Sequence, residues 1–88
     1  MIVRVKVLGV QLNKHWEWKG KEGTNNYLHV AYEEPMSGTD NLGSRVEKLK
    51  FGTDVREVYS VLPGDVCGVD FDRYGKAVYC EVLEHGGE

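Results

Sequence analysis

The chain has 88 residues, of which 41% are hydrophobic and 28% charged, and its formal net charge is −3 at pH 7. This length predicts a single domain over residues 1–88 with a modest core. The longest apolar run is far shorter than the roughly 20 residues that cross a membrane, so we expect no membrane partner. Residues 1–7 alternate apolar and basic side chains rather than forming a signal peptide, which predicts a cytoplasmic protein.

The N-terminal segment has the pattern of a bent strand. The odd-numbered valines from Val3 to Val7 share one face, and basic residues share the other. The apolar positions change to even numbers after Gly9, which predicts a β-bulge at this glycine. Residues 16–18 are interpreted as the strand end or a loop. The Gly and Asn content of residues 20–26 predicts a turn-rich connection.

Two more strands are predicted in the middle of the chain. Residues 27–32 alternate, with the even-numbered side chains on one face. Residues 33–44 contain Pro, Gly and Asn with almost no apolar side chain, which predicts a mobile surface loop. Residues 45–51 form the third predicted strand, with Leu49 and Phe51 pointing inward.

The segment of residues 53–62 changes to a helical period. Asp54 followed by Glu57 is typical of a helix start with reciprocal capping bonds. Pro63–Gly64 would end this helix. The apolar positions at helical spacing are Val55, Val58, Tyr59 and Leu62.

The last two predicted strands cover residues 65–72 and 76–84. If they pair through Asp72 and Gly75, Cys67 and Cys80 lie nearly opposite each other, and we expect both to be buried, reduced thiols. A register shift of one residue would place them on opposite faces. Two cysteines and three scattered histidines lack the spacing of metal ligands, so we expect no metal and no cofactor.

The order of these elements predicts a mostly β protein. Five strands with a short helix between strands 3 and 4 is the order found in a five-stranded oligonucleotide-binding (OB) barrel, which is the expected fold. Another small barrel, such as an SH3-like one, and a different α+β arrangement are the alternatives. Asp65, Asp70 and Asp72 are interpreted as structural, and no Ser–His–Asp, Cys–His or Gly-rich phosphate motif occurs, so we expect no enzyme.

Aromatic residues beside cations are the main functional signal. Exposed rings can stack on bases while cations contact phosphates. Tyr74 occupies the tip of the last hairpin between Arg73 and Lys76. Its alternative interpretation is an ordinary turn tyrosine that covers a neighbouring strand.

A second aromatic group precedes the turn-rich segment. Trp16 and Trp18 are two residues apart and would share a strand face. They could form a stacking platform, plug one end of the core, or belong to a protein–protein interface. The neighbouring cations are Lys14, Lys19 and Lys21. Lys48 and Lys50 lie together on the third strand, where either a phosphate contact or a solvated face explains them.

Three segments resemble the small single-stranded-DNA-binding proteins of filamentous phages, which are OB-fold dimers that coat the viral strand. They are Gly23-Thr24-Asn25-Asn26-Tyr27, Tyr32, and the hairpin Arg73-Tyr74-Gly75-Lys76. The resemblance implies that Tyr27 contacts DNA, that Tyr32 occupies a second tyrosine position, and that Tyr74 stacks on bases. It also implies a homodimer that acts in the replication or transfer of a phage or another mobile element.

The expected function is therefore sequence-independent binding of single-stranded DNA, with RNA as a possible substitute ligand. The alternative is a small β-barrel adaptor that binds another protein and no nucleic acid. The expected nucleic-acid-binding residues are Lys14, Trp16, Trp18, Lys19, Lys21, Tyr27, Tyr32, Lys48, Lys50, Arg73, Tyr74 and Lys76.

Overall fold

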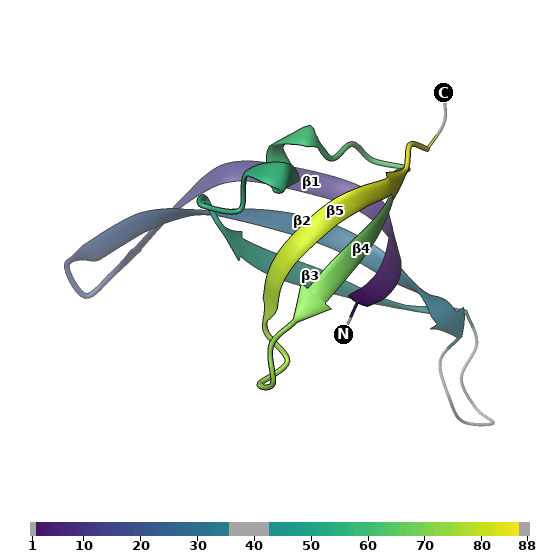
Figure 1. Ribbon diagram of the computed structural model, residues 1–88. Helices are drawn as coiled ribbons and strands as arrows, with labels where there is room; N and C mark the ends of the chain where they lie inside the picture. The colour runs from purple at the N-terminus through teal and green to yellow at the C-terminus, as the bar shows by residue number, and fades with distance from the viewer. Residues whose placement is uncertain (1, 36–42, 87–88) are drawn as a thin grey trace.

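The computed structural model describes residues 2–35 and 43–86. They form one five-stranded antiparallel sheet with the strand order β3-β2-β1-β4-β5 (Figure 1). The elements are β1 (Ile2–Trp18), β2 (Lys21–Pro35), β3 (Ser44–Gly52), the 3₁₀ helix η1 (Arg56–Ser60), β4 (Val66–Phe71) and β5 (Ala77–Glu84). The sheet is open, with β3 and β5 as its edges, and it curls so that these two strands approach each other.

The inner face of the curled sheet forms the core. The predicted inward residues of β1, β2 and β3 are buried or packed half-buried against the core, except Leu12, which is 41% exposed, and the 3₁₀ helix adds Val58. Apart from Leu12, alternation therefore assigned the faces of these three strands correctly. The fully buried apolar side chains include Val5, Val7, Leu28, Val30, Phe51 and Val69.

The bulge predicted at Gly9 is confirmed. Val7 pairs with Val30 and Gly9 pairs with His29, so Leu8 is an extra residue of β1 with no partner of its own on β2. A bulge bends its strand and increases the local twist, which is how β1 follows the curl of the sheet.

Three predictions about connections are wrong in whole or in part. Residues 20–26 are not a turn-rich connection, because β1 and β2 run on as strands to a two-residue turn. β2 continues to Pro35, so the start of the predicted loop at residues 33–44 is strand, and residues 36–42 of that loop lie outside the described residues. A short helix does lie between β3 and β4, but it is a single 3₁₀ segment whose N-cap is Val55 and not Asp54, and the Asp54 carboxylate lies back over Gly52.

The two cysteines are buried and free, as expected. They share the inner face, but Cys67 pairs with Val82, so Cys80 is its diagonal neighbour rather than its partner. The register differs for two reasons: Asp72 is bonded to Lys76 rather than placed opposite Gly75, and the pairing shifts by one more residue between Phe71↔Ala77 and Asp70↔Tyr79. Burial raises the pKa of the Cys67 thiol to about 11 and that of the Cys80 thiol to about 12, which leaves both protonated at neutral pH.

Asp65 fastens the turn before β4 to the rest of the fold. Its buried carboxylate accepts the N–H groups of Gly86 and Leu62, each at 2.9 Å. The same turn pairs with Val7 of β1 through two main-chain bonds of 2.8 Å. The backbone bonds from Gly86 and Leu62 hold the pKa of Asp65 below its usual value.

We expect Asp65→Asn to lower Tm by roughly 5–10 °C at pH 7, because an amide cannot accept both N–H groups. Since the folded pKa is depressed, the charged carboxylate stabilises the fold above its unfolded pKa of 3.8, and this stabilisation is lost as the pH falls through the folded pKa. Thermal unfolding between pH 2 and 7 should show a flatter acid limb for the variant. Glu81→Gln, at an exposed position of β5, is the control and should leave the Tm at pH 7 and the slope of the acid limb unchanged. A wild-type profile for Asp65→Asn would contradict this role.

Candidate functional site

The most prominent feature outside the core is a two-stranded arm made of residues 14–25, the distal ends of β1 and β2. Figure 1 shows it projecting from the body of the sheet. Its turn is Lys19–Gly20, and both residues have positive φ, 50° and 77°. This is the backbone of a type I′ turn, which matches the twist of the paired strands and allows β1 and β2 to extend as one ribbon.

The two faces of the arm differ in chemistry. Directly paired residues share a face, so Trp16 with Gly23 and Trp18 with Lys21 lie on one side, together with Lys14 and Asn25. The opposite side carries His15, Glu17, Glu22 and Thr24. Aromatic and basic side chains are thus separated from the acidic ones by alternation alone.

Both tryptophans are on the surface, with Trp16 38% and Trp18 68% exposed, so the interpretation that they plug the core is wrong. Trp16 lies against Gly23, where a Cβ would come within 2.8 Å of its ring. In the amide orientation that satisfies both of its partners, the Asn25 oxygen accepts the Trp16 indole N–H at 3.1 Å. These two contacts hold the Trp16 ring in place. The Trp18 ring has the Lys19 ammonium 5.5 Å from its centre.

The base of the arm is fixed to the body by asparagines. A second bulge in β1 places Asn13 at a φ of 56°, and its N–H donates to the buried Asn26 Oδ1 at 2.7 Å. The Tyr59 hydroxyl of η1 donates to Asn13 Oδ1 at 2.9 Å. The arm consequently leaves the sheet in a defined direction rather than hinging freely at its base.

The aromatic side of the arm continues onto the outer face of β2 and β3. Tyr27 pairs with Lys50 and His29 with Lys48, all on the side opposite the core. The Lys48 ammonium lies 4.5 Å from the Tyr27 ring centre. We call this continuous surface the cationic face: Lys14, Trp16, Trp18, Lys21, Tyr27, His29, Lys48 and Lys50.

Few negative charges interrupt the cationic face. The positions of β2 from Lys21 to Ala31 and of β3 from Val46 to Lys50 that point to this face carry no Asp or Glu; Glu22 and Glu47 point to the other face. One negative charge does lie on it: Asp54 places its carboxylate over Gly52, which pairs with Asn25 in the row of Lys14. A chain of net charge −3 therefore presents a locally positive surface. An approaching polyanion responds to this local potential and not to the net charge.

Tyr32 is not brought to the cationic face. It lies on the core side of β2, where its hydroxyl donates to Glu47 at 2.6 Å and the Arg45 guanidinium covers its ring at 4.1 Å. Burial, together with the bond to Glu47, raises the pKa of Tyr32, and the same bond lowers the pKa of Glu47. These three residues form a closed group, so Tyr32 is poorly placed for a ligand that binds Tyr27.

The β4–β5 hairpin carries the other expected aromatic. Tyr74 is 79% exposed at the tip, and the Arg73 guanidinium lies 5.0 Å from its ring centre. Asp72 Oδ1 accepts the N–H groups of Tyr74 and Lys76, each at 2.9 Å, which fixes the loop. Figure 1 shows this hairpin leaving the sheet at a different place from the arm, so the fold does not gather the two aromatic groups into one site.

Sequence reasoning did not assign a role to Leu8 or Val46, which flank His29 and Lys48 in a depression of the cationic face. The phase change at Gly9 was the available signal, since a bulge exposes its extra residue. Among the described residues, no group of His, Cys, Asp and Glu side chains is arranged to hold a metal ion. In the same part of the chain, no helix has the length and apolar character needed to cross a membrane.

Comparison with protein-family models, with curated proteins and with solved structures finds no match to this chain.

Proposed function

We propose that this protein binds single-stranded DNA without sequence preference through the cationic face. The observation that carries the proposal is the sorting of side chains on one surface, where three aromatic rings alternate with lysines and the carboxylates of the arm lie on its other side. Stacking contributes about 1–3 kcal/mol per base and tolerates any sequence, because every base has a π-face. The role that suits such binding is the coating of strands in replication or transfer of a phage or another mobile element.

The finer fold that accompanies this proposal is an OB-like barrel. Three features support it: the strand order, the approach of the edge strands β3 and β5, and a short helix between β3 and β4. The three-stranded part of the sheet, β1-β2-β3, would then provide the binding surface.

The proposal includes a homodimer. The apolar patch that would form its interface also favours a second candidate function. Ile2 and Leu83 both lie over Gly68 and are exposed, which makes an apolar patch away from the cationic face. A second copy would cover such a patch, and so would another protein if the chain is an adaptor. A dimer seen in sedimentation together with DNA binding supports the first function, whereas a monomer that ignores DNA supports the second.

The test is tryptophan fluorescence during titration with a dT oligonucleotide of about 20 nucleotides. This is longer than the roughly 4–16 nucleotides that a single OB fold covers. Trp16 and Trp18 are the only tryptophans of the chain, and both lie on the cationic face. We expect quenching at about 50 mM salt that is reversed at about 1 M, because phosphate contacts release counterions. Unchanged fluorescence with flat anisotropy of a labelled oligonucleotide would overturn the proposal. An RNA oligonucleotide of equal length measures the preference between the two nucleic acids.

A further inference from the structure

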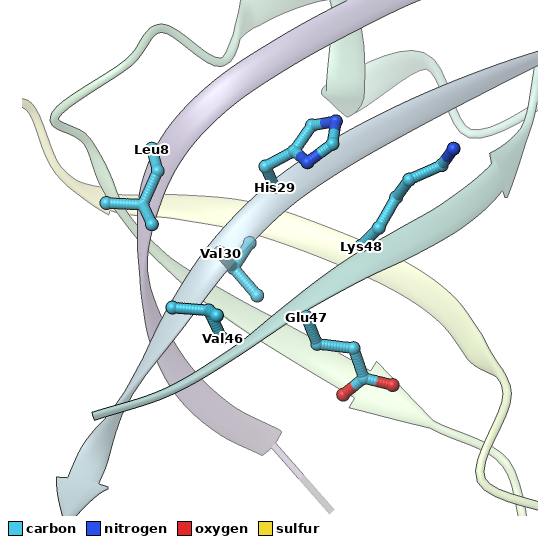
Figure 2. A pocket seen from close by; sticks show the side chains of 6 residues that line it. All are labelled: Leu8, His29, Val30, Val46, Glu47 and Lys48. Atoms are coloured by element: carbon cyan, nitrogen blue, oxygen red, sulfur yellow. The ribbon is translucent and has the colours of Figure 1, made fainter. Parts of the chain in front are cut away.

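A shallow depression of about 320 Å³ lies on the cationic face where β1, β2 and β3 run side by side (Figure 2). Leu8 of β1 and Val46 of β3 are its apolar walls, and they are 52% and 62% exposed. His29 and Lys48 provide its polar side. The depression therefore combines exposed apolar contact with a cation, next to the Tyr27 ring that Lys48 already contacts.

The strand register explains why the surface is low at this point. The β1 bulge turns Leu8 outward, while the row below it places the small Ala31 between Lys6 and Val46. Val30 is fully buried on the other side of the sheet, so it lines the depression with main chain.

Glu47 also lines the depression without making it acidic. Figure 2 shows its carboxylate turned away from His29 and Lys48, and that carboxylate is bonded to the Tyr32 hydroxyl and to Arg45. Lys6 adds a second ammonium on the same face, one row away. The depression is thus apolar in its walls and positive at its rim.

We propose that this depression is a nucleobase subsite, in which one base of the bound strand leaves its stack and lies between Leu8 and Val46. The proposal rests on the proposed function. The charge of Lys48 and Lys6 suits the phosphates that flank such a base, and the depression is continuous with the cationic face.

His29 adds a polar contact for the base. Its Nε2 lies 3.0 Å from Gln11 Oε1, and in the tautomer that donates Nε2–H to this oxygen, Nδ1 is an acceptor. Each of the four DNA bases has an N–H group that could donate to that nitrogen. This subsite consequently accepts any base and adds no sequence preference.

The experiment compares a dT oligonucleotide with an abasic oligonucleotide of equal length, which keeps the phosphates and lacks the bases. Two readouts are followed together: the fluorescence of the arm tryptophans and the methyl resonances of Leu8 and Val46. We expect the methyl resonances to shift with dT and not with the abasic strand. The variant Leu8→Asn/Val46→Thr should bind dT about tenfold more weakly, since apolar contact is lost at two positions, and the abasic strand unchanged. The matched control is Leu62→Asn/Val78→Thr, which alters two exposed positions outside the depression.

Each other outcome overturns the subsite. If the tryptophans are quenched by dT but the methyl resonances stay fixed and the variant binds normally, the subsite is wrong and the proposed function stands. If both strands shift the methyl resonances equally, the backbone and not a base lies there. Methyl shifts that depend on protein concentration without DNA would indicate that a second copy occupies the depression. If neither readout responds to dT, the proposed function fails as well.

Discussion

Trp16→Ala/Trp18→Ala should weaken binding of a dT oligonucleotide several hundred-fold. Each ring that stacks on a base contributes about 1–3 kcal/mol, so one ring accounts for roughly 30-fold and both together for the larger loss. Trp18 is the more exposed ring, and Trp16 is held against Gly23. Anisotropy of a labelled oligonucleotide measures the effect, because the variant has no tryptophan left to report it.

The arm offers a matched control on its other side. His15→Ala/Thr24→Ala alters the same ribbon and leaves the cationic face intact, so it should bind like the wild type. Trp18→Phe keeps a ring and should recover most of the affinity that Trp18→Ala loses. Both tryptophan positions lie outside the core, so circular dichroism should show folded variants. If the double variant binds dT normally while Tyr74→Ala does not, the site is at the β4–β5 tip and not on the arm.

The parts of the fold that the sequence predicted are those where one face is buried. In residues 27–32 every second side chain faces the core, and in residues 45–51 Leu49 and Phe51 do, so apolar alternation reports both the strand and its orientation. The bulge at Gly9 was found for the same reason, because it shifts the phase of a buried pattern. Burial of one face requires an apolar residue at alternate positions, and this alternation can be recognised in the sequence without a structure.

The arm was missed because neither of its faces is buried. Residues 14–22 are all exposed, so no apolar alternation marks them as strand, and the Gly and Asn content of residues 20–26 resembles a loop. What forms the ribbon is the Lys19–Gly20 turn and the asparagine contacts at its base, which depend on residues from β1, β2 and η1. The same reasoning applies to the short helix, where Asp54 has the capping position in sequence but lies over Gly52 instead.

The candidate site was therefore predicted by residue type and not by arrangement. The lysines, Trp16, Trp18 and Tyr74 are exposed, whereas Tyr27 and Tyr32 are half-buried, and sequence could not show which of these residues share a surface. The sheet order decides this, because β2 lies between β1 and β3 and places Tyr27 and Lys50 beside the arm. Alternation along β2, which the sequence does show, puts Tyr32 on the face opposite Tyr27.

Lys48→Gln/Lys50→Gln tests the electrostatic half of the proposal. A single-stranded ligand loses about 0.7 in the slope of log K against log[salt] for each phosphate contact removed, so the double variant should lower the slope by about 1.4. The same relation predicts about 60-fold weaker binding at 50 mM salt and nearly equal binding close to 1 M. Salt titrations of wild type and variant with one dT oligonucleotide measure both quantities.

The decisive comparison removes the same charge elsewhere. Arg73→Gln/Lys76→Gln deletes two cations at the β4–β5 tip and gives the same net charge as the β3 variant. If binding depends on where charge lies, the tip variant keeps the wild-type slope, because the β4–β5 tip and the arm leave the sheet at different places. Equal loss in both variants would mean that net charge alone governs binding, and the sorting of side chains by strand alternation would then have no functional consequence. A loss confined to the tip variant would move the phosphate contacts to the hairpin, with Tyr74 as their aromatic partner.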